Sequence, residues 1–125
     1  MGKKKVFVAF AMEDKKYRDL LRGQSLHTRS PFVYTDFSVK QPFSRAWKTQ
    51  VRQRIAGCDG AIALLSRNVR TADGARWEIK CAVDQGIPIR GVFISGTDRY
   101  VPPELAGKRT LRWTWDNIAN FIGKL

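Results

Sequence analysis

The sequence is poor in the residues from which most metal and nucleophilic sites are built. It contains one histidine, His27, and two cysteines, Cys58 and Cys81. A single imidazole argues against a histidine-based zinc site and against a Ser/His/Asp triad, and no Gly-x-Ser-x-Gly motif is present. The cysteines form no Cys-x-x-Cys pair, so we expect them to be small buried side chains in a reducing compartment. The sequence therefore predicts a cytoplasmic protein without a metal site.

Long hydrophobic runs, repeats and linkers are also absent. No stretch approaches the ~20 apolar positions that a membrane-spanning helix needs. The basic residues 1–5 run directly into a strand-like segment of about six residues, which is too short for a signal peptide. Proline and glycine are scattered, and no segment has low complexity. We therefore expect a single domain over residues 1–125 and no contact with a membrane.

Acidic residues are scarce relative to basic ones. The chain has 11 Asp and Glu against 23 Lys and Arg, which gives a net charge of +12 at pH 7. Such a field favours anionic partners, including nucleic acids and phosphorylated small molecules. No RNA-recognition aromatic motif, zinc-finger spacing or helix-turn-helix accompanies the charge. A basic surface without a nucleic-acid role is the favoured interpretation, and nucleic-acid binding stays open as an alternative.

What the sequence does contain is a regular alternation of apolar runs and amphipathic helical patterns. The apolar runs predict strands at residues 5–11, 32–35, 61–65, 87–94 and 110–113. Helices are expected after the first, second, third and fifth strands, with Ser44 capping the second helix and Asp73 capping the third, which is predicted over residues 74–84. Such alternation is typical of a parallel sheet with helices on both faces. We therefore predict an α/β, flavodoxin-like three-layer sandwich whose five-stranded parallel sheet has the order 2-1-3-4-5.

This strand order predicts where a ligand binds. The order reverses between the first and third strands, so the ligand crevice should lie beyond their carboxyl ends. The loops at residues 10–14 and 66–74 are expected to meet there, with the 36–44 loop close by. Glu78 lies one turn into the helix after the third strand and should face the same crevice. The dipole of that helix favours the ionised form of Glu78.

Several segments together resemble a known family. Residues 6–14 are similar to the opening box of Toll/interleukin receptor (TIR) domains, in which a strand runs into an acidic turn and a helix. Residues 59–68, followed by 77–79, resemble the third strand and the glutamate helix of bacterial TIR-like proteins, particularly the short family that includes the Thoeris anti-phage TIR subunit. Residues 36–38 and the terminal residues 113–118 fit the same family. The resemblance covers nearly the whole chain.

The resemblance implies cleavage of the nicotinamide N-glycosidic bond of NAD, with Glu78 as the catalytic residue and NAD as a substrate, so that no cofactor is needed. Nicotinamide leaves as a neutral molecule, so a general acid is unnecessary, unlike in ordinary glycosidases. A fixed carboxylate would stabilise the positive charge that develops on the ribose. Attack by water would give ADP-ribose. Attack from within the same molecule would give a cyclic ADP-ribose isomer, which signals to an effector protein in Thoeris-like defence.

The resemblance also suggests residues that bind the substrate. The expected set comes from the first loop, the second loop and the two following helices: Phe10, Ala11, Asp36, Ser38, Arg45 and Trp77. Phe10 is expected to stack on a flat ring, and basic side chains such as Arg45 to hold the diphosphate. Two positions depart from the family pattern. Ala11 stands where signalling TIR domains often have a serine or tyrosine. Gly74 stands where many TIR enzymes have a tryptophan, and the adjacent Trp77 points about 100 degrees away from Glu78, so we expect it to pack or form a rim.

Each of these residues also has a purely structural interpretation. Glu78 could be an exposed helix acid paired with an arginine of its own loop, and Asp36 could simply shape a turn. Ser38 could be a cap, while Phe10 and Trp77 could belong to the core. Three functions therefore stay open: an NAD-consuming defence enzyme that self-associates through TIR–TIR contacts, a non-catalytic TIR-type assembly module, and a basic nucleic-acid-binding domain.

Overall fold

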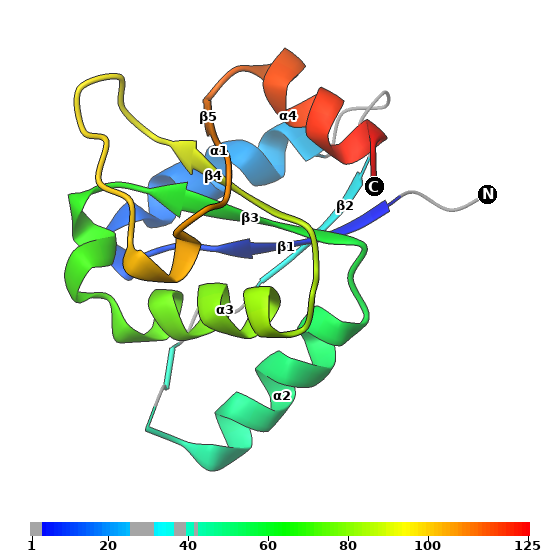
Figure 1. Ribbon diagram of the computed structural model, residues 1–125, viewed down its shortest axis with the longest axis vertical. Coiled ribbons are helices and arrows are strands. Elements are labelled where there is room, and N and C mark those ends of the chain that lie inside the picture. The colour runs from blue at the N-terminus through cyan, green and yellow to red at the C-terminus, as the bar shows by residue number, and fades with distance from the viewer. Residues whose placement is uncertain (1–3, 26–31, 37–39, 42) are drawn as a thin grey trace.

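A computed structural model of the chain describes residues 4–25, 32–36, 40–41 and 43–125. Its strands form one sheet in the order β2-β1-β3-β4-β5 (Figure 1). They are β1 (Lys4–Ala9), β2 (Phe32–Thr35), β3 (Gly60–Leu65), β4 (Ile89–Phe93) and β5 (Thr110–Arg112). Every pairing between neighbouring strands is parallel. The predicted α/β class with a parallel sheet is confirmed.

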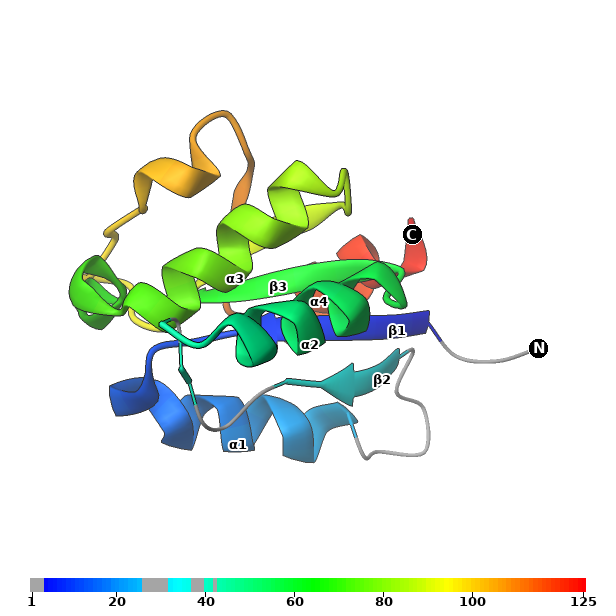
Figure 2. The same ribbon diagram turned by 90° about the horizontal axis from the view of Figure 1, so that it is seen from below.

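The helices cover both faces of this sheet. They are α1 (Lys15–Ser25), α2 (Arg45–Ala56), α3 (Asp73–Asp84) and α4 (Trp115–Gly123), with short 3-10 helices η1 (Met12–Asp14), η2 (Arg67–Thr71) and η3 (Pro103–Leu105). Helices α2 and α3 lie on one face, and α1 and α4 lie on the other (Figure 1). Figure 2 views the same arrangement with α2 and α3 in front of the strands. Among the described residues, no helix has the length and apolar character needed to cross a bilayer.

Alternation along β1 divides the core into two halves. Phe7 faces α2 and α3, while Val6 and Val8 face α1 and α4, and each of the three is at most 1% exposed. Strand β3, in the centre of the sheet, is buried at all six positions. Burial on both faces explains why this strand appears in the sequence as a continuous apolar run instead of an alternating one.

Element boundaries differ from the prediction in ways that have local causes. Strand β1 ends at Ala9 because the chain turns into η1, whose Asp14 N–H donates to the carbonyl of Ala11 at 2.8 Å. The prediction of Asp73 as an N-cap is wrong. Helix α3 begins at Asp73 itself, with Ala72 in the capping position and no side-chain cap. The Asp73 carboxylate instead lies in the first turn, where the helix dipole favours it. Ser44 does cap α2, since its hydroxyl oxygen accepts a hydrogen bond from the backbone N–H of Trp47, the third residue of the helix.

Candidate functional site at the carboxyl edge of the sheet

Loops from β1 and β3 meet beyond the carboxyl ends of these strands, as predicted. Asp14 in η1 is 3% exposed and joins them. Its carboxylate accepts a hydrogen bond of 2.5 Å from the hydroxyl of Ser66 and one of 2.9 Å from the side-chain amide of Asn68. Ser66 directly follows β3, and its hydroxyl oxygen also accepts from the Asn68 backbone N–H. This network fixes the two loops to each other. The sequence interpretation did not single out Asp14 or Ser66, although the acidic turn after the first strand was the available signal.

Glu78 lies on α3, near the same edge, and is completely buried. Its carboxylate is held by the Lys40 ammonium group, with Nζ at 2.7 Å from Oε1 and 2.9 Å from Oε2. The Lys40 side chain is itself only 7% exposed. The interpretation of Glu78 as an exposed helix acid paired with an arginine of its own loop is therefore wrong. The partner is a lysine that folds back from the loop between β2 and α2.

The stem of Lys40 is packed against Gly74, one turn before Glu78. A Cβ atom at Gly74 would lie 2.6 Å from the Cβ of Lys40, closer than such atoms can approach. The Lys40 ammonium also lies 4.1 Å from the centre of the Phe10 ring, within the range of a cation–π contact. Position 74 is the position at which many TIR enzymes are expected to carry a tryptophan. In this chain the lysine stem fills the space that a large side chain at position 74 would need.

Burial and charge act in opposite directions on Glu78. Removal of the carboxylate from water raises the pKa of Glu78 to about 8, while the Lys40 ammonium group lowers the pKa and the Asp36 carboxylate raises it further. Desolvation is the largest of these effects. A perturbed carboxyl group beside a specific charged partner is typical of a functional site, although structural ion pairs also produce this pattern.

Asp36 lies close to this pair but is itself in an ion pair. Its carboxylate is 2.7 Å from Nη1 of Arg18, whose side chain is nearly buried. Arg54 of α2 donates to the Asp36 backbone carbonyl at 2.8 Å. The Arg18 guanidinium group also lies 5.1 Å from the centre of the Phe10 ring. Asp36 therefore connects β2 to α1 and α2 and adds negative charge near Glu78.

The other predicted binding residues have different places. Phe10 is 0% exposed and belongs to the core half beneath α1 and α4, so the structure does not present its ring to an open pocket. Ala11 is also buried. Arg45 is exposed at the start of α2. Ser38 lies outside the described residues.

Trp77 packs between α2 and α3, away from Glu78. Its ring centre is 5.6 Å from that of Trp47, and the cationic groups of Lys48 and Arg52 lie over its ring. The expectation that Trp77 is a packing residue is supported by these contacts. The structure therefore brings Glu78, Phe10 and the unpredicted Lys40 together, with Asp36 near them.

Within the described part of the chain, the cysteines and the other metal-binding residue types form no second reactive site and no metal site. Cys58 and Cys81 are both buried and unpaired. Burial raises the pKa of the Cys58 thiol to about 11, which disfavours the reactive thiolate. In the ranges that the structure describes, no group of three His, Cys, Asp or Glu side chains is arranged to hold a metal ion.

A parallel α/β sheet with a buried glutamate on the helix after its third strand is the arrangement expected of TIR-like domains. The comparison with protein families agrees with this class. The family model described as Thoeris protein ThsB, TIR-like domain, matches residues 7–99. Because the match covers most of the chain, this protein belongs to the TIR-like domain family of the Thoeris protein ThsB. A comparison with curated proteins finds no match.

Proposed function

We propose that this chain is a TIR-type defence enzyme that cleaves the nicotinamide N-glycosidic bond of NAD, with Glu78 as the catalytic residue. The observation that supports it most directly is the burial of the Glu78 carboxylate, at 0% exposure, against a single cationic partner at the carboxyl edge of the sheet. Membership in the ThsB TIR-like family supports the defence role.

Cleavage of the bond between nicotinamide and ribose is favoured by a buried carboxylate close to the place where positive charge develops. In the reaction the bond between the ribose C1′ and the nicotinamide nitrogen breaks, and its electron pair leaves with neutral nicotinamide. Positive charge then develops on the ribose ring, and a fixed carboxylate excluded from water stabilises that charge strongly. Water attacks C1′ and loses a proton to give ADP-ribose. Attack by a group of the same molecule gives a cyclic isomer, which can act as a diffusible signal to an effector protein.

Lys40 determines access to Glu78. Since the carboxylate is completely buried, NAD reaches it only after the lysine side chain has moved away. A departing ammonium group leaves the carboxylate without its counter-charge in a site of low polarity, which is unfavourable. The nicotinamide-bearing ribose restores a positive charge at that place. The ammonium group in this structure therefore stands in for the charge that develops in the reaction.

The test is to incubate the protein with NAD and measure nicotinamide, ADP-ribose and cyclic products by chromatography. Removing one group that stabilises transition-state charge costs roughly 100-fold or more in rate, so Glu78→Gln should lower nicotinamide release by that factor. The matched control is Glu104→Gln, which removes a carboxylate from the ion pair with Arg76, at 3.0 Å, instead of the pair with Lys40. Release should then stay close to that of the unmodified chain.

The assay has to be run under conditions that allow assembly, because a neighbouring copy can complete the pocket of a TIR-type enzyme. High protein concentration and a crowding agent provide such conditions. If folded protein releases no nicotinamide there, or if Glu78→Gln releases as much as the unmodified chain, the proposal is wrong.

A non-catalytic assembly module is the second candidate, and one observation favours it. Phe43, in the loop before α2, is 86% exposed, the largest exposed fraction among the large hydrophobic residues that the structure describes. This candidate predicts oligomers that dissociate on dilution and on Phe43→Ser substitution, without turnover of NAD. Sedimentation velocity measures the association. A nucleic-acid role would instead appear as binding that weakens steeply with salt.

A further inference from the structure

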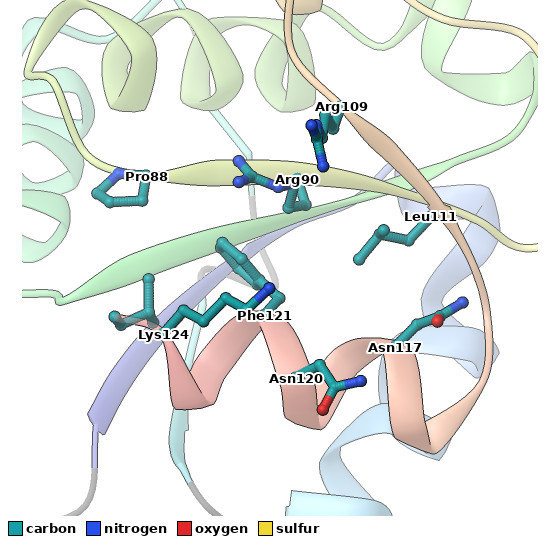
Figure 3. A pocket seen from close by; sticks show the side chains of 9 residues that line it. Pro88, Arg90, Arg109, Leu111, Asn117, Asn120, Phe121 and Lys124 are labelled. Atoms are coloured by element: carbon teal, nitrogen blue, oxygen red, sulfur yellow. The ribbon is translucent and has the colours of Figure 1, made fainter.

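A basic hollow lies at the opposite edge of the sheet from Glu78. It has a volume of about 200 Å³ and lies between β4, the start of β5 and α4 (Figure 3). Its cationic lining residues come from three segments: Arg90 from β4, Arg109 directly before β5, and Lys124 directly after α4. Asn117 and Asn120 of α4 add side-chain amides, and none of the described residues that line the hollow has an acidic side chain.

Arg90 occupies a position where the strand pattern favours an apolar residue. Its register partner on β3, Ile62, and its neighbour on the same side of β4, Val92, are both 0% exposed and belong to the core half beneath α4. The Arg90 guanidinium group lies 5.0 Å from the centre of the Phe121 ring, and its Nη1 donates to the carbonyl of Ile89 at 2.9 Å. A charged group held at the border of a core, against the local pattern, points to a role other than packing.

The sheet register places a second arginine next to the first. Gly91 of β4 pairs with Thr110 of β5, and the Gly91 N–H donates to the Arg109 carbonyl at 3.2 Å. The residue before each of these partners is an arginine, so Arg90 on β4 stands beside Arg109, which directly precedes β5 (Figure 3). Like charges opposite each other destabilise a sheet. A bound anion would remove this repulsion.

The cations of the hollow also lack the acidic partners found elsewhere in the protein. Among the described residues, the ion pairs within 4.0 Å join Arg18, Lys40, Arg67, Arg76 and Lys80 to carboxylates. Arg90, Arg109 and Lys124 are in none of them. Their charges are therefore available to a ligand.

We propose that this hollow binds the phosphate group of a small phosphorylated molecule. A guanidinium group matches phosphate oxygens with two parallel hydrogen bonds, and a lysine adds a point charge. Arg90 is the anchored member, since Phe121 and the Ile89 carbonyl hold it in place. The exposed Arg109 and Lys124 close on the ligand from the two sides. The site is separate from Glu78, so the proposal does not depend on NAD cleavage.

Calorimetric titration with sodium pyrophosphate at constant ionic strength tests the proposal. The unmodified chain should bind with a saturable isotherm. Arg109→Gln and Lys124→Gln should each weaken binding about tenfold, the size expected for one hydrogen bond to a charged group. Both residues are exposed, so the variants should keep the fold. Lys108→Gln is the matched control because it removes the same charge from an exposed neighbour that does not line the hollow.

Further titrations distinguish the sources of the phosphate. ADP that binds more tightly than pyrophosphate, with no binding of adenosine, supports the proposal with a nucleotide as ligand, and equal affinities support a free phosphate compound. Unsaturable binding of pyrophosphate, or equal weakening by Lys108→Gln, would show only a diffuse positive field and overturn it. A short DNA duplex that displaces pyrophosphate and binds more tightly through Arg109 would overturn the assignment to a small molecule.

Discussion

The carboxyl edge of the sheet contains two buried carboxylates that are stabilised in different ways. Asp14 accepts hydrogen bonds from two neutral groups, the Ser66 hydroxyl and the Asn68 amide, which belong to the loop it fastens. Glu78 is held by the ammonium group of Lys40, from a loop 38 residues earlier in the chain. Two neutral donors from one loop hold Asp14 in a fixed position. A single long cationic side chain makes a contact that another cation can replace.

The largest effect on stability should come from Lys40→Met. Breaking a buried ion pair by removing one partner costs about 3 to 5 kcal/mol, because the remaining charge is left without compensation. The cost should grow as the pH rises through about 8, because Glu78 then ionises in the unmodified chain and gains a pairing with Lys40 that the variant lacks. Urea denaturation at pH 6 and pH 9 measures the free energy of unfolding.

The control for this variant is the double substitution Lys40→Met with Glu78→Gln. It leaves no uncompensated charge and should recover part of the lost stability at pH 9. If Lys40→Met is as stable as the unmodified chain at pH 9, the pair contributes nothing and the contrast with Asp14 disappears.

Loss of the hydrogen bonds to Asp14 should lower the free energy of unfolding by the next largest amount. Asp14→Ala leaves the Ser66 hydroxyl and the Asn68 amide without their acceptor, which costs about 1 to 3 kcal/mol for each donor that stays buried. Ser66→Ala and the double variant complete a cycle, and the coupling energy should be roughly 0.5 to 3 kcal/mol. Additive effects of the two substitutions would mean that Asp14 and Ser66 do not interact in solution.

Stability should also depend on pH through Glu78. The pKa of Glu78 is about 8 in the folded chain and 4.5 for an unperturbed glutamate, so the folded state holds more protons between these values. The contribution of Glu78 to stability is therefore complete below about pH 4.5 and is lost as the pH rises through about 8. Thermal denaturation from pH 4.5 to 8.5 should show a flatter profile for Glu78→Gln than for the unmodified chain. Identical slopes would contradict the raised pKa.

The sequence predicted the parallel fold better than it predicted the site. Continuous apolar runs such as the one in β3 exist because both faces of the sheet are covered, so the residues themselves report this architecture. Glu78 could be located from the topology alone, since the helix after the third strand starts at the carboxyl edge. Lys40 could not, because nothing in a loop sequence indicates that its side chain will fold onto a helix 38 residues away.

Burial of individual polar residues was equally hard to predict. Glu13 and Asp14 are consecutive acids in the same turn, yet Glu13 is exposed while Asp14 is 3% exposed, and only the position of Ser66 and Asn68 in space distinguishes them. For Phe10, a place in the core and a stacking role were both open from the sequence. The ring is buried in the core, and the Lys40 ammonium group lies 4.1 Å from its centre, so Phe10 also borders the site of Glu78.

The close approach of Lys40 to Gly74 limits which residues can occur at these two positions during evolution. A bulky side chain at position 74 and a lysine stem at position 40 cannot occupy the same space, so they are alternative ways to cover the acid on α3. A related chain with a tryptophan at position 74 would have no room for the lysine side chain at position 40, and a chain with this lysine has no room for the tryptophan. The residues at positions 40 and 74 should therefore covary among related chains.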